Sequence, residues 1–157
     1  MKLPILFEDP NLLVIDKPAG LLSQGDISGD PSVVSLLQEY LGRPYVGLVH
    51  RLDRNTSGAL VVAKRTKAAE RLTTQLQNGR LQRVYLAWVE GMFTQNEWQW
   101  EHALRKNERT NEVTAYRASN APTGAKLAKL SARRVSFIKD VPGLHQGASL
   151  LELKLET

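Results

Sequence analysis

The sequence contains no cysteine. This absence excludes disulfide bonds and thiolate metal sites, and with them the common zinc frameworks. Long apolar runs are also missing, because no run approaches the roughly 20 residues that a membrane-spanning helix needs. Residues 1–5 lack the apolar segment and the small-residue cleavage site of a secretory signal. These absences favour a cytoplasmic protein that does not cross a membrane.

The length and composition are those of an ordinary folded protein. The chain has 157 residues, of which 42% are hydrophobic and 24% are charged, so it is long enough for a real core and too apolar to be disordered. It shows no internal repeat, low-complexity stretch or linker. We therefore expect one domain over residues 1–157.

The positive charge is concentrated in two blocks. Residues 51–83 carry eight Lys or Arg against two acidic residues, and residues 105–139 carry nine against two, although the net charge of the chain is only +5. One such block is most often a solvated face, but two blocks favour a polyanionic partner. The charge pattern predicts nucleic acid binding that weakens as salt rises, because neutralised phosphates release counterions.

The spacing of apolar residues predicts strands at both ends of the chain and two helices in its first half. Asp30 and Pro31 are expected to begin a helix that ends at Gly42, and Thr66 is expected to cap a second helix that stops at Gly79. Strands are expected over residues 5–8, 12–16, 45–49, 59–63, 82–89, 98–103, 112–118, 126–138 and 149–156. Strands that do not alternate regularly with helices indicate an α+β fold with a mixed, mostly antiparallel sheet.

A polar turn at residues 50–58 holds an acid between two cations. Asp53 lies between Arg51 and Arg54, where the first of two apolar runs ends. A carboxylate with a cation on either side stays ionised at neutral pH, which suits a nucleophile or a base. The same residues also make a good plain turn, since Asp, Asn and Ser bond to nearby amides and Gly accepts positive φ. Residue types alone favour the plain turn.

The run HRLDRNTSG at residues 50–58 resembles the HRLDxxTSG signature of the RluA family of pseudouridine synthases and matches every fixed position. Residues 12–21 are similar to the family's opening strand and Lys-Pro-x-Gly turn. Residues 83–91 are similar to its Lys-x-Tyr-x-Ala-x-Val-x-Gly strand, with Arg83 in place of the usual Lys. The three motifs occur in the family's order.

One motif of the family is missing. In relatives, a strand like residues 150–157 runs into Gly-Arg-x-His-Gln-Ile-Arg, whose first arginine pairs with the catalytic aspartate. The resemblance therefore implies a catalytic domain that is incomplete at its C-terminus. It also implies a domain without the small S4-type RNA-binding module that many relatives carry in front.

The resemblance implies an α+β pseudouridine synthase fold with a central RNA cleft. The implied reaction isomerises specific uridines in structured ribosomal or transfer RNA to pseudouridine, with no metal or other cofactor, and a monomer is expected. Asp53 matches the catalytic aspartate. It could attack C1′ of the ribose or accept a ribose proton as a glycal forms, and both routes stay open.

Other residues take roles from the same resemblance. Tyr85 matches the active-site tyrosine that stacks on the uracil, although a core tyrosine is the better interpretation without the motif. Arg51 is expected to fill the gap left by the extruded nucleotide, or else to contact phosphate or pair with Asp53. Lys17 either shapes the cleft through backbone packing or is an exposed turn lysine, and Arg54 is a further candidate RNA contact.

The remaining candidates are weaker. Lys126 and Lys129, together with Arg133 and Arg134, could follow an RNA backbone or form a solvated strand face. Trp98 and Trp100 share a strand face and could stack on bases, but they more often fill a core. His50 is expected to be a structural histidine, and neither of the other two histidines, at positions 102 and 145, is assigned a function.

Two other functions compete with the synthase. The first is an inactive RNA-binding remnant of the family, which would keep the basic blocks without a competent site. The second is an Asp-dependent hydrolase with His50 nearby, which is disfavoured because no serine or cysteine nucleophile stands in a recognisable elbow.

Overall fold

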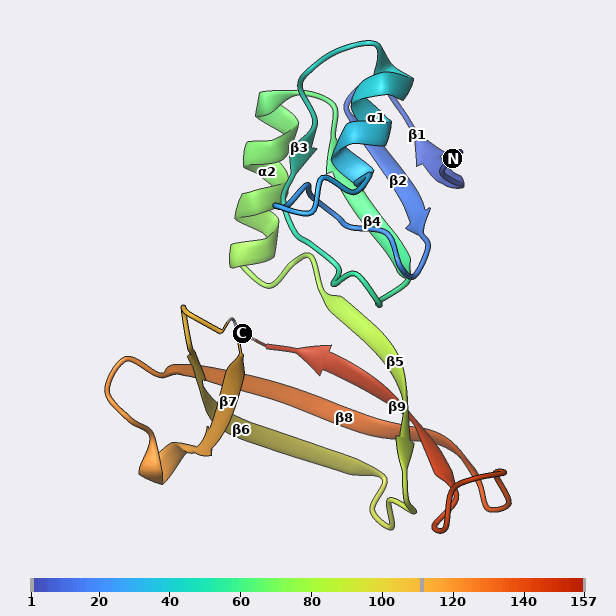
Figure 1. Ribbon diagram of the computed structural model, residues 1–157, viewed down its shortest axis with the longest axis vertical. Coiled ribbons are helices and arrows are strands. Elements are labelled where there is room, and N and C mark those ends of the chain that lie inside the picture. Colours follow the sequence, from blue (N-terminus) through green and yellow to red (C-terminus); the bar gives the residue numbers. More distant parts are fainter. Residues whose placement is uncertain (1, 111, 157) are drawn as a thin grey trace. The chain divides into compact units, whose positions relative to one another are not determined.

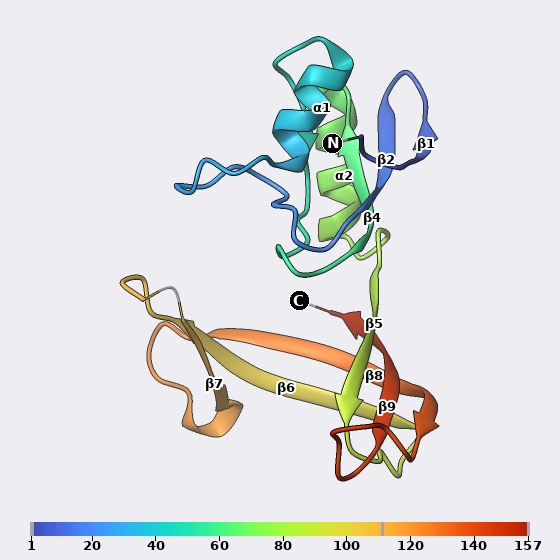
Figure 2. The same ribbon diagram turned by 45° about the vertical axis from the view of Figure 1, so that its right-hand side comes forward.

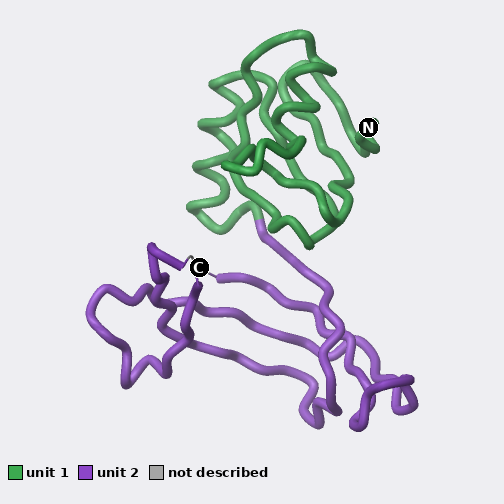
Figure 3. Tube along the Cα trace, viewed as in Figure 1, with its two compact units in different colours: residues 1–81 green, residues 82–157 purple. Residues whose placement is uncertain are grey.

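The computed structural model describes residues 2–110 and 112–156 and divides the chain into two compact units, Met1–Leu81 and Gln82–Thr157 (Figure 3). Both units contain antiparallel sheets, and the helices α1 and α2 belong to the first unit (Figure 1). Three residues of the predicted catalytic domain, Met1, Asn111 and Thr157, lie outside the described residues.

Unit 1 is built on a four-stranded sheet with the order β1-β2-β4-β3. The strands are β1 (Ile5–Glu8), β2 (Leu12–Lys17), β3 (Gly47–Leu48) and β4 (Gly58–Ala63). The predicted opening hairpin is confirmed, since β1 pairs antiparallel with β2. The strand expected over residues 45–49 is reduced to two residues, because only Gly47 and Leu48 find partners on β4.

Helix α2 (Thr66–Gln77) covers one face of this sheet. It buries Ala68 and Leu72 against Ala63 of β4. The close approach of α2 needs a glycine on β3, since a Cβ at Gly47 would lie 3.1 Å from the Cβ of Ala69 on the helix. The predicted cap at Thr66 is wrong by one residue, because Arg65 is the N-cap and makes no side-chain capping bond.

Helix α1 (Val33–Leu41) begins later than the sequence suggested. Ser32 caps it in a reciprocal capping box with Ser35, so Asp30 and Pro31 lie outside the helix. The prediction of Asp30 as the cap is wrong because the helix begins only after Ser32, and the Asp30 carboxylate forms an ion pair with Arg54. The predicted end is confirmed: Gly42 is the C-cap, with φ of 62°, a conformation that favours glycine.

Unit 2 is a five-stranded antiparallel sheet with the order β5-β9-β8-β6-β7. Its strands are β5 (Arg83–Glu90), β6 (Glu97–Lys106), β7 (Val113–Arg117), β8 (Lys126–Ile138) and β9 (Ala148–Leu155), with a short 3-10 turn, Ala118–Asn120. Figure 2 shows the long β6 and β8 strands running side by side. The bounds predicted for β8 are confirmed, and those of the other four strands differ by one to three residues.

The two faces of the unit 2 sheet are unequal. Side chains of β5 alternate between half-buried and exposed, and Val84, Leu86 and Trp88 are 49, 65 and 55% exposed. On the opposite face, Ala132 of β8 and Leu151 of β9 are almost fully buried. Tyr85 pairs with Leu153, and Leu153 pairs with Ala132, so these three side chains lie on the same face of the sheet. This face carries the core of the unit.

The α+β class and the antiparallel pairing are confirmed, since all the strand pairs named above are antiparallel. The expected single sheet is instead two sheets, one in each unit. Among the described residues, no helix is both long enough and apolar enough to cross a membrane.

Candidate active site

The run 50–58 forms an irregular turn that connects β3 to β4 in unit 1. Asp53 is exposed in this turn, as are its neighbours Arg51 and Arg54. The amide of Thr56 donates to the carbonyl oxygen of Asp53 at 3.0 Å, which closes the turn. Gly58 begins β4 with φ of 122°, a conformation that side-chain-bearing residues rarely adopt. The turn therefore presents one carboxylate to solvent from a defined backbone.

Lys17 supports the turn through hydrogen bonds to backbone carbonyl groups. Its side chain is fully buried at the end of β2, where it lies opposite Gly58. Its ammonium donates to the carbonyl oxygens of Leu21 at 2.7 Å, Pro18 at 3.1 Å and Arg54 at 3.2 Å. The expectation of an exposed turn lysine is therefore wrong, and a buried lysine of this kind is tolerated because its donors are used.

The charge of Lys17 is set by opposing effects. Burial lowers the pKa of the ammonium below its usual value of 10.5, because the charged form loses hydration. The negative charge of Asp53 acts in the opposite direction and raises that pKa. Lys17 and Asp53 are thus electrostatically coupled inside unit 1, although the carboxylate is exposed and the ammonium is buried.

Ser23 binds the backbone of Leu52, the residue that precedes Asp53. Its hydroxyl donates to the carbonyl oxygen of Leu52 at 2.5 Å and accepts from the amide of Leu52 at 3.1 Å. The amide of Gly20 in turn donates to the carbonyl oxygen of Arg54 at 2.8 Å. The segment 17–23 therefore binds the backbone of both neighbours of Asp53, Leu52 and Arg54. No local sequence pattern predicts the role of Ser23, because its partner Leu52 lies 29 positions away.

Arg54 is already engaged within unit 1. Its Nε donates to the carbonyl oxygen of Gly20 at 3.1 Å, and its guanidinium lies 2.8 Å from a carboxylate oxygen of Asp30. Any contact with RNA by Arg54 would therefore compete with this ion pair. Arg51 is exposed and His50 is half-buried at the start of the turn.

Tyr85 belongs to unit 2. It lies on β5 in a row that crosses the sheet through Leu153 and Ala132 to Trp98. Its side chain is half-buried, whereas the apolar residues that alternate with it are exposed. Tyr85 thus belongs to the more enclosed face of the sheet, and its catalytic role stays a prediction.

The two tryptophans of β6 form an aromatic cluster with Phe93. The rings of Trp98 and Trp100 are stacked, with centroids 6.3 Å apart and an interplanar angle of 17°. Phe93 meets the ring of Trp98 edge-on, with centroids 5.0 Å apart. The three side chains of the cluster are half-buried and pack against one another. This packing agrees with the core interpretation of both tryptophans.

The four basic residues of β8 do not form one row. Pairing with β6 places Lys126 and Arg134 on one face of the strand and Lys129 and Arg133 on the other. Lys129 lies 2.5 Å from Glu101, Arg133 lies 3.2 Å from Glu152, and Arg134 donates to the carbonyl oxygen of Phe93. A single phosphate track along all four is not present in unit 2.

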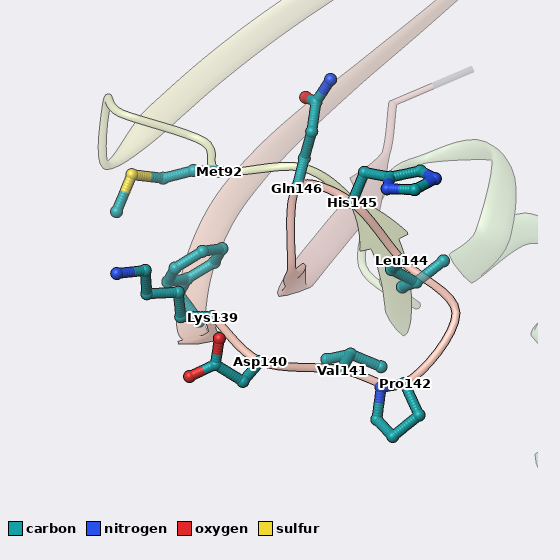
Figure 4. Close-up of a pocket in the computed structure, with 9 residues that line it drawn as sticks. Met92, Lys139, Asp140, Val141, Pro142, Leu144, His145 and Gln146 are labelled. Carbon is teal, nitrogen blue, oxygen red and sulfur yellow. The ribbon is translucent and has the colours of Figure 1, made fainter.

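A separate pocket lies in unit 2, where the loop between β8 and β9 faces Met92 (Figure 4). Its loop residues include Asp140 and His145, and none of the predicted site residues lines it. Within residues 2–110 and 112–156, no group of three or more His, Asp or Glu side chains could hold a metal ion.

Comparison with known proteins agrees with this architecture. The family model described as RNA pseudouridylate synthase matches residues 11–157. An uncharacterised RNA pseudouridine synthase of Mycoplasma genitalium is 34% identical over 161 aligned residues, covering all of this chain and 48% of that protein. Ribosomal large subunit pseudouridine synthase D of Pseudomonas aeruginosa is 39% identical over 99 residues, covering 60% of this chain and 31% of that protein.

A solved structure supports the fold. The human protein titled RNA pseudouridylate synthase domain containing 1 matches with a TM-score of 0.78 at 22% identity, over 99% of this chain and 60% of that one. The chain thus spans about half the length of the Mycoplasma relative. Because the family model covers nearly the whole chain and crosses both units, this chain belongs to the RNA pseudouridylate synthase family.

Proposed function

We propose that the chain is catalytic-domain sequence of an RNA pseudouridine synthase of the RluA type, and that Asp53 is its catalytic residue. The proposed reaction isomerises uridines in structured ribosomal or transfer RNA. The observation that carries the proposal is an exposed carboxylate whose two neighbours in sequence, Leu52 and Arg54, both have their carbonyl oxygens bound by buried donors. The family match over residues 11–157 supports the reaction class.

The proposed chemistry needs a carboxylate and no redox step. Breaking the N1 to C1′ bond frees the uracil, which turns over and bonds to C1′ through C5. Asp53 would either attack C1′ or accept a ribose proton as a glycal forms, and each role requires an ionised oxygen beside the sugar. A backbone held on both sides suits either role, because it limits the motion of the carboxylate.

Two further roles are proposed from the family motifs. Tyr85 would stack on the uracil, and its place on the enclosed face of the unit 2 sheet agrees with an aromatic contact. Arg51 would fill the gap left by the extruded nucleotide, which its exposure permits. Extrusion costs a few kcal/mol and least for an unpaired base, so loops of folded RNA are the proposed targets.

The experiment is release of tritium from RNA labelled at uracil C5, since only replacement of the C5 hydrogen frees the label. We expect release by the parent chain and none by Asp53→Asn, which keeps the size of the side chain and removes its charge. The matched control is Asp16→Asn, an exposed aspartate of β2 in the same unit. It should release tritium at the parent rate.

The same assay separates the proposal from an inactive RNA binder. A parent chain that binds RNA and releases no label would overturn the proposed activity for this chain. Equal release by the parent and by Asp53→Asn would keep the reaction and overturn the role of Asp53. Circular dichroism of each variant establishes that a loss of release is not a loss of folding.

A further inference from the structure

We propose that Ser23 is a positioning residue of the synthase, acting on Asp53 through the peptide groups of Leu52. This inference rests on the proposed function, because it gives Ser23 a role only if Asp53 carries the chemistry. Ser23 lies outside the three sequence motifs and between β2 and α1, in a segment with no regular structure. Ser23 is nevertheless buried, with only 5% of the residue exposed.

The geometry of Ser23 is that of a two-sided clamp. One hydroxyl oxygen both donates to the Leu52 carbonyl, at 2.5 Å, and accepts from the Leu52 amide, at 3.1 Å. Leu52 belongs to no strand, and its side chain is buried. Buried amide and carbonyl groups need partners, and Ser23 supplies one to each across 29 residues of sequence. Both peptide groups of Leu52 are therefore oriented by one side chain.

This orientation passes directly to Asp53. The Leu52 carbonyl and the Asp53 nitrogen belong to one planar peptide group, which also contains the Cα atom of Asp53. Holding that carbonyl therefore also orients the Asp53 nitrogen and Cα, from which the side chain extends. On the far side, Gly20 and Lys17 bind the carbonyl of Arg54. Ser23 thus holds the residue before Asp53, and Lys17 holds the residue after it.

The segment that carries Ser23 is itself anchored. The amide of Val33 donates to the carbonyl oxygen of Leu22 at 2.8 Å, and Leu22 bridges to Ser32, the cap of α1. The backbone next to Ser23 is therefore bound to the first residues of α1. A positioning residue needs a rigid backbone of its own, because a mobile residue could not hold its partner in one orientation.

The test compares Ser23→Ala with Ser23→Thr, which keeps the hydroxyl, and with Ser28→Ala as the matched control. Ser28 is an exposed serine of the same segment that bonds to Asp26 and not to the turn. Amide hydrogen exchange at Leu52 is measured by NMR, together with kcat and KM for tritium release. Exchange at β2 and α1 amides reports whether the unit stays folded.

We expect Ser23→Ala to speed exchange at Leu52 about tenfold or more, while β2 and α1 stay protected. Its kcat should fall roughly 10- to 100-fold with KM for RNA unchanged, as expected for a displaced catalytic group. Ser23→Thr should recover at least part of kcat, and Ser28→Ala should match the parent. A structural role alone would not separate kcat from KM in this way.

The inference is overturned if Ser23→Ala keeps the parent kcat, or if Leu52 keeps its protection, or if kcat falls only in proportion to the unfolded fraction. It is also overturned if Ser23→Thr, folded and with Leu52 protected, is as slow as Ser23→Ala. If the parent releases no tritium, the proposed function fails for this chain. Hydrogen exchange then decides the clamp by itself, because fast exchange confined to the turn supports it and unchanged exchange removes it.

Discussion

The buried ammonium of Lys17 lies 3.2 Å from the carbonyl oxygen of Arg54, the residue that follows the proposed catalytic aspartate. This contact joins the end of β2 to a turn 37 residues later in the chain. It is made to a peptide oxygen and not to a side chain. Lys17 therefore supports the turn whatever residue stands at position 54, and it needs the N–H donors and the length of its side chain to do so.

Replacing Lys17 by methionine should destabilise the protein. The variant keeps the apolar stem and removes the donors, so the carbonyl groups of Pro18, Leu21 and Arg54 lose a buried partner. We expect the free energy of unfolding to fall by about 2–4 kcal/mol, on the scale of unsatisfied buried polar groups. Urea unfolding measures the change. Lys67→Met, at an exposed lysine of α2, is the control and should change little.

The same pair of proteins should respond to alkaline pH. The pKa of Lys17 is lowered in the folded state, so between that value and 10.5 the unfolded chain binds more protons at this site. Stability contributed by Lys17 therefore rises with pH inside this window. The difference in unfolding free energy between the parent and Lys17→Met should grow in favour of the parent as pH approaches 10.5. A difference that shrinks would contradict the lowered pKa.

Glu8 should contribute an acid-sensitive part of the stability. Lys64 lies 2.6 Å from its carboxylate and the hydroxyl of Tyr40 lies 2.9 Å from it, and these hydrogen bonds lower the pKa of Glu8 below 4.5. A lowered folded-state pKa gives stability that is present above about 4.5 and is lost as pH falls through the folded value. The advantage of the parent over Glu8→Gln should therefore disappear in acid. Thermal unfolding between pH 7 and pH 3 tests this.

Releasing Arg54 from Asp30 should strengthen RNA binding. Both side chains are about half exposed, so the ion pair contributes at most about 1 kcal/mol to folding. Asp30→Asn should leave unfolding nearly unchanged and free a guanidinium beside the turn, raising RNA affinity about two- to fivefold at low salt. Fluorescence anisotropy measures the affinity. Asp16→Asn makes the same charge change elsewhere in unit 1, and an equal gain there would show a general charge effect.

Lys126 and Lys129 should differ in their effect on RNA binding. Lys129 is paired with Glu101 and lies on the opposite face of β8 from Lys126, which is exposed. We expect Lys126→Ala to weaken binding and to reduce the slope of log affinity against log salt by about 0.7. Lys129→Ala should change that slope less. The reverse order would place the RNA on the Lys129 face.

Local pattern was enough to predict most of the strands and the turn of Asp53. The turn-forming residues on either side of β8 indicated its bounds, and the polar run 50–58 between apolar segments indicated the turn. The split of Lys126 from Lys129 was also available from the sequence, because a spacing of three in a strand puts side chains on opposite faces. Whether either face binds RNA stays a prediction.

Long-range contacts were not available from local pattern. Asp30 and Ser32 are both good helix caps, and the sequence could not show that Arg54 binds Asp30 and leaves the cap to Ser32. Burial of Lys17 and the clamp of Ser23 depend on the folding of segment 17–23 against the turn. Such contacts arise only when segments distant in sequence meet, so neither could be deduced from neighbours.

The clamp around Asp53 has an evolutionary consequence. The hydrogen bonds from Lys17, Gly20 and Ser23 are made to backbone amide and carbonyl groups of Leu52 and Arg54, which nearly every amino acid possesses. Selection for the clamp therefore leaves position 54 free to drift, so that its side chain can adapt to different RNA surfaces while the aspartate stays in place. Proline at position 52 is the foreseeable exception, because it has no amide hydrogen to offer the serine.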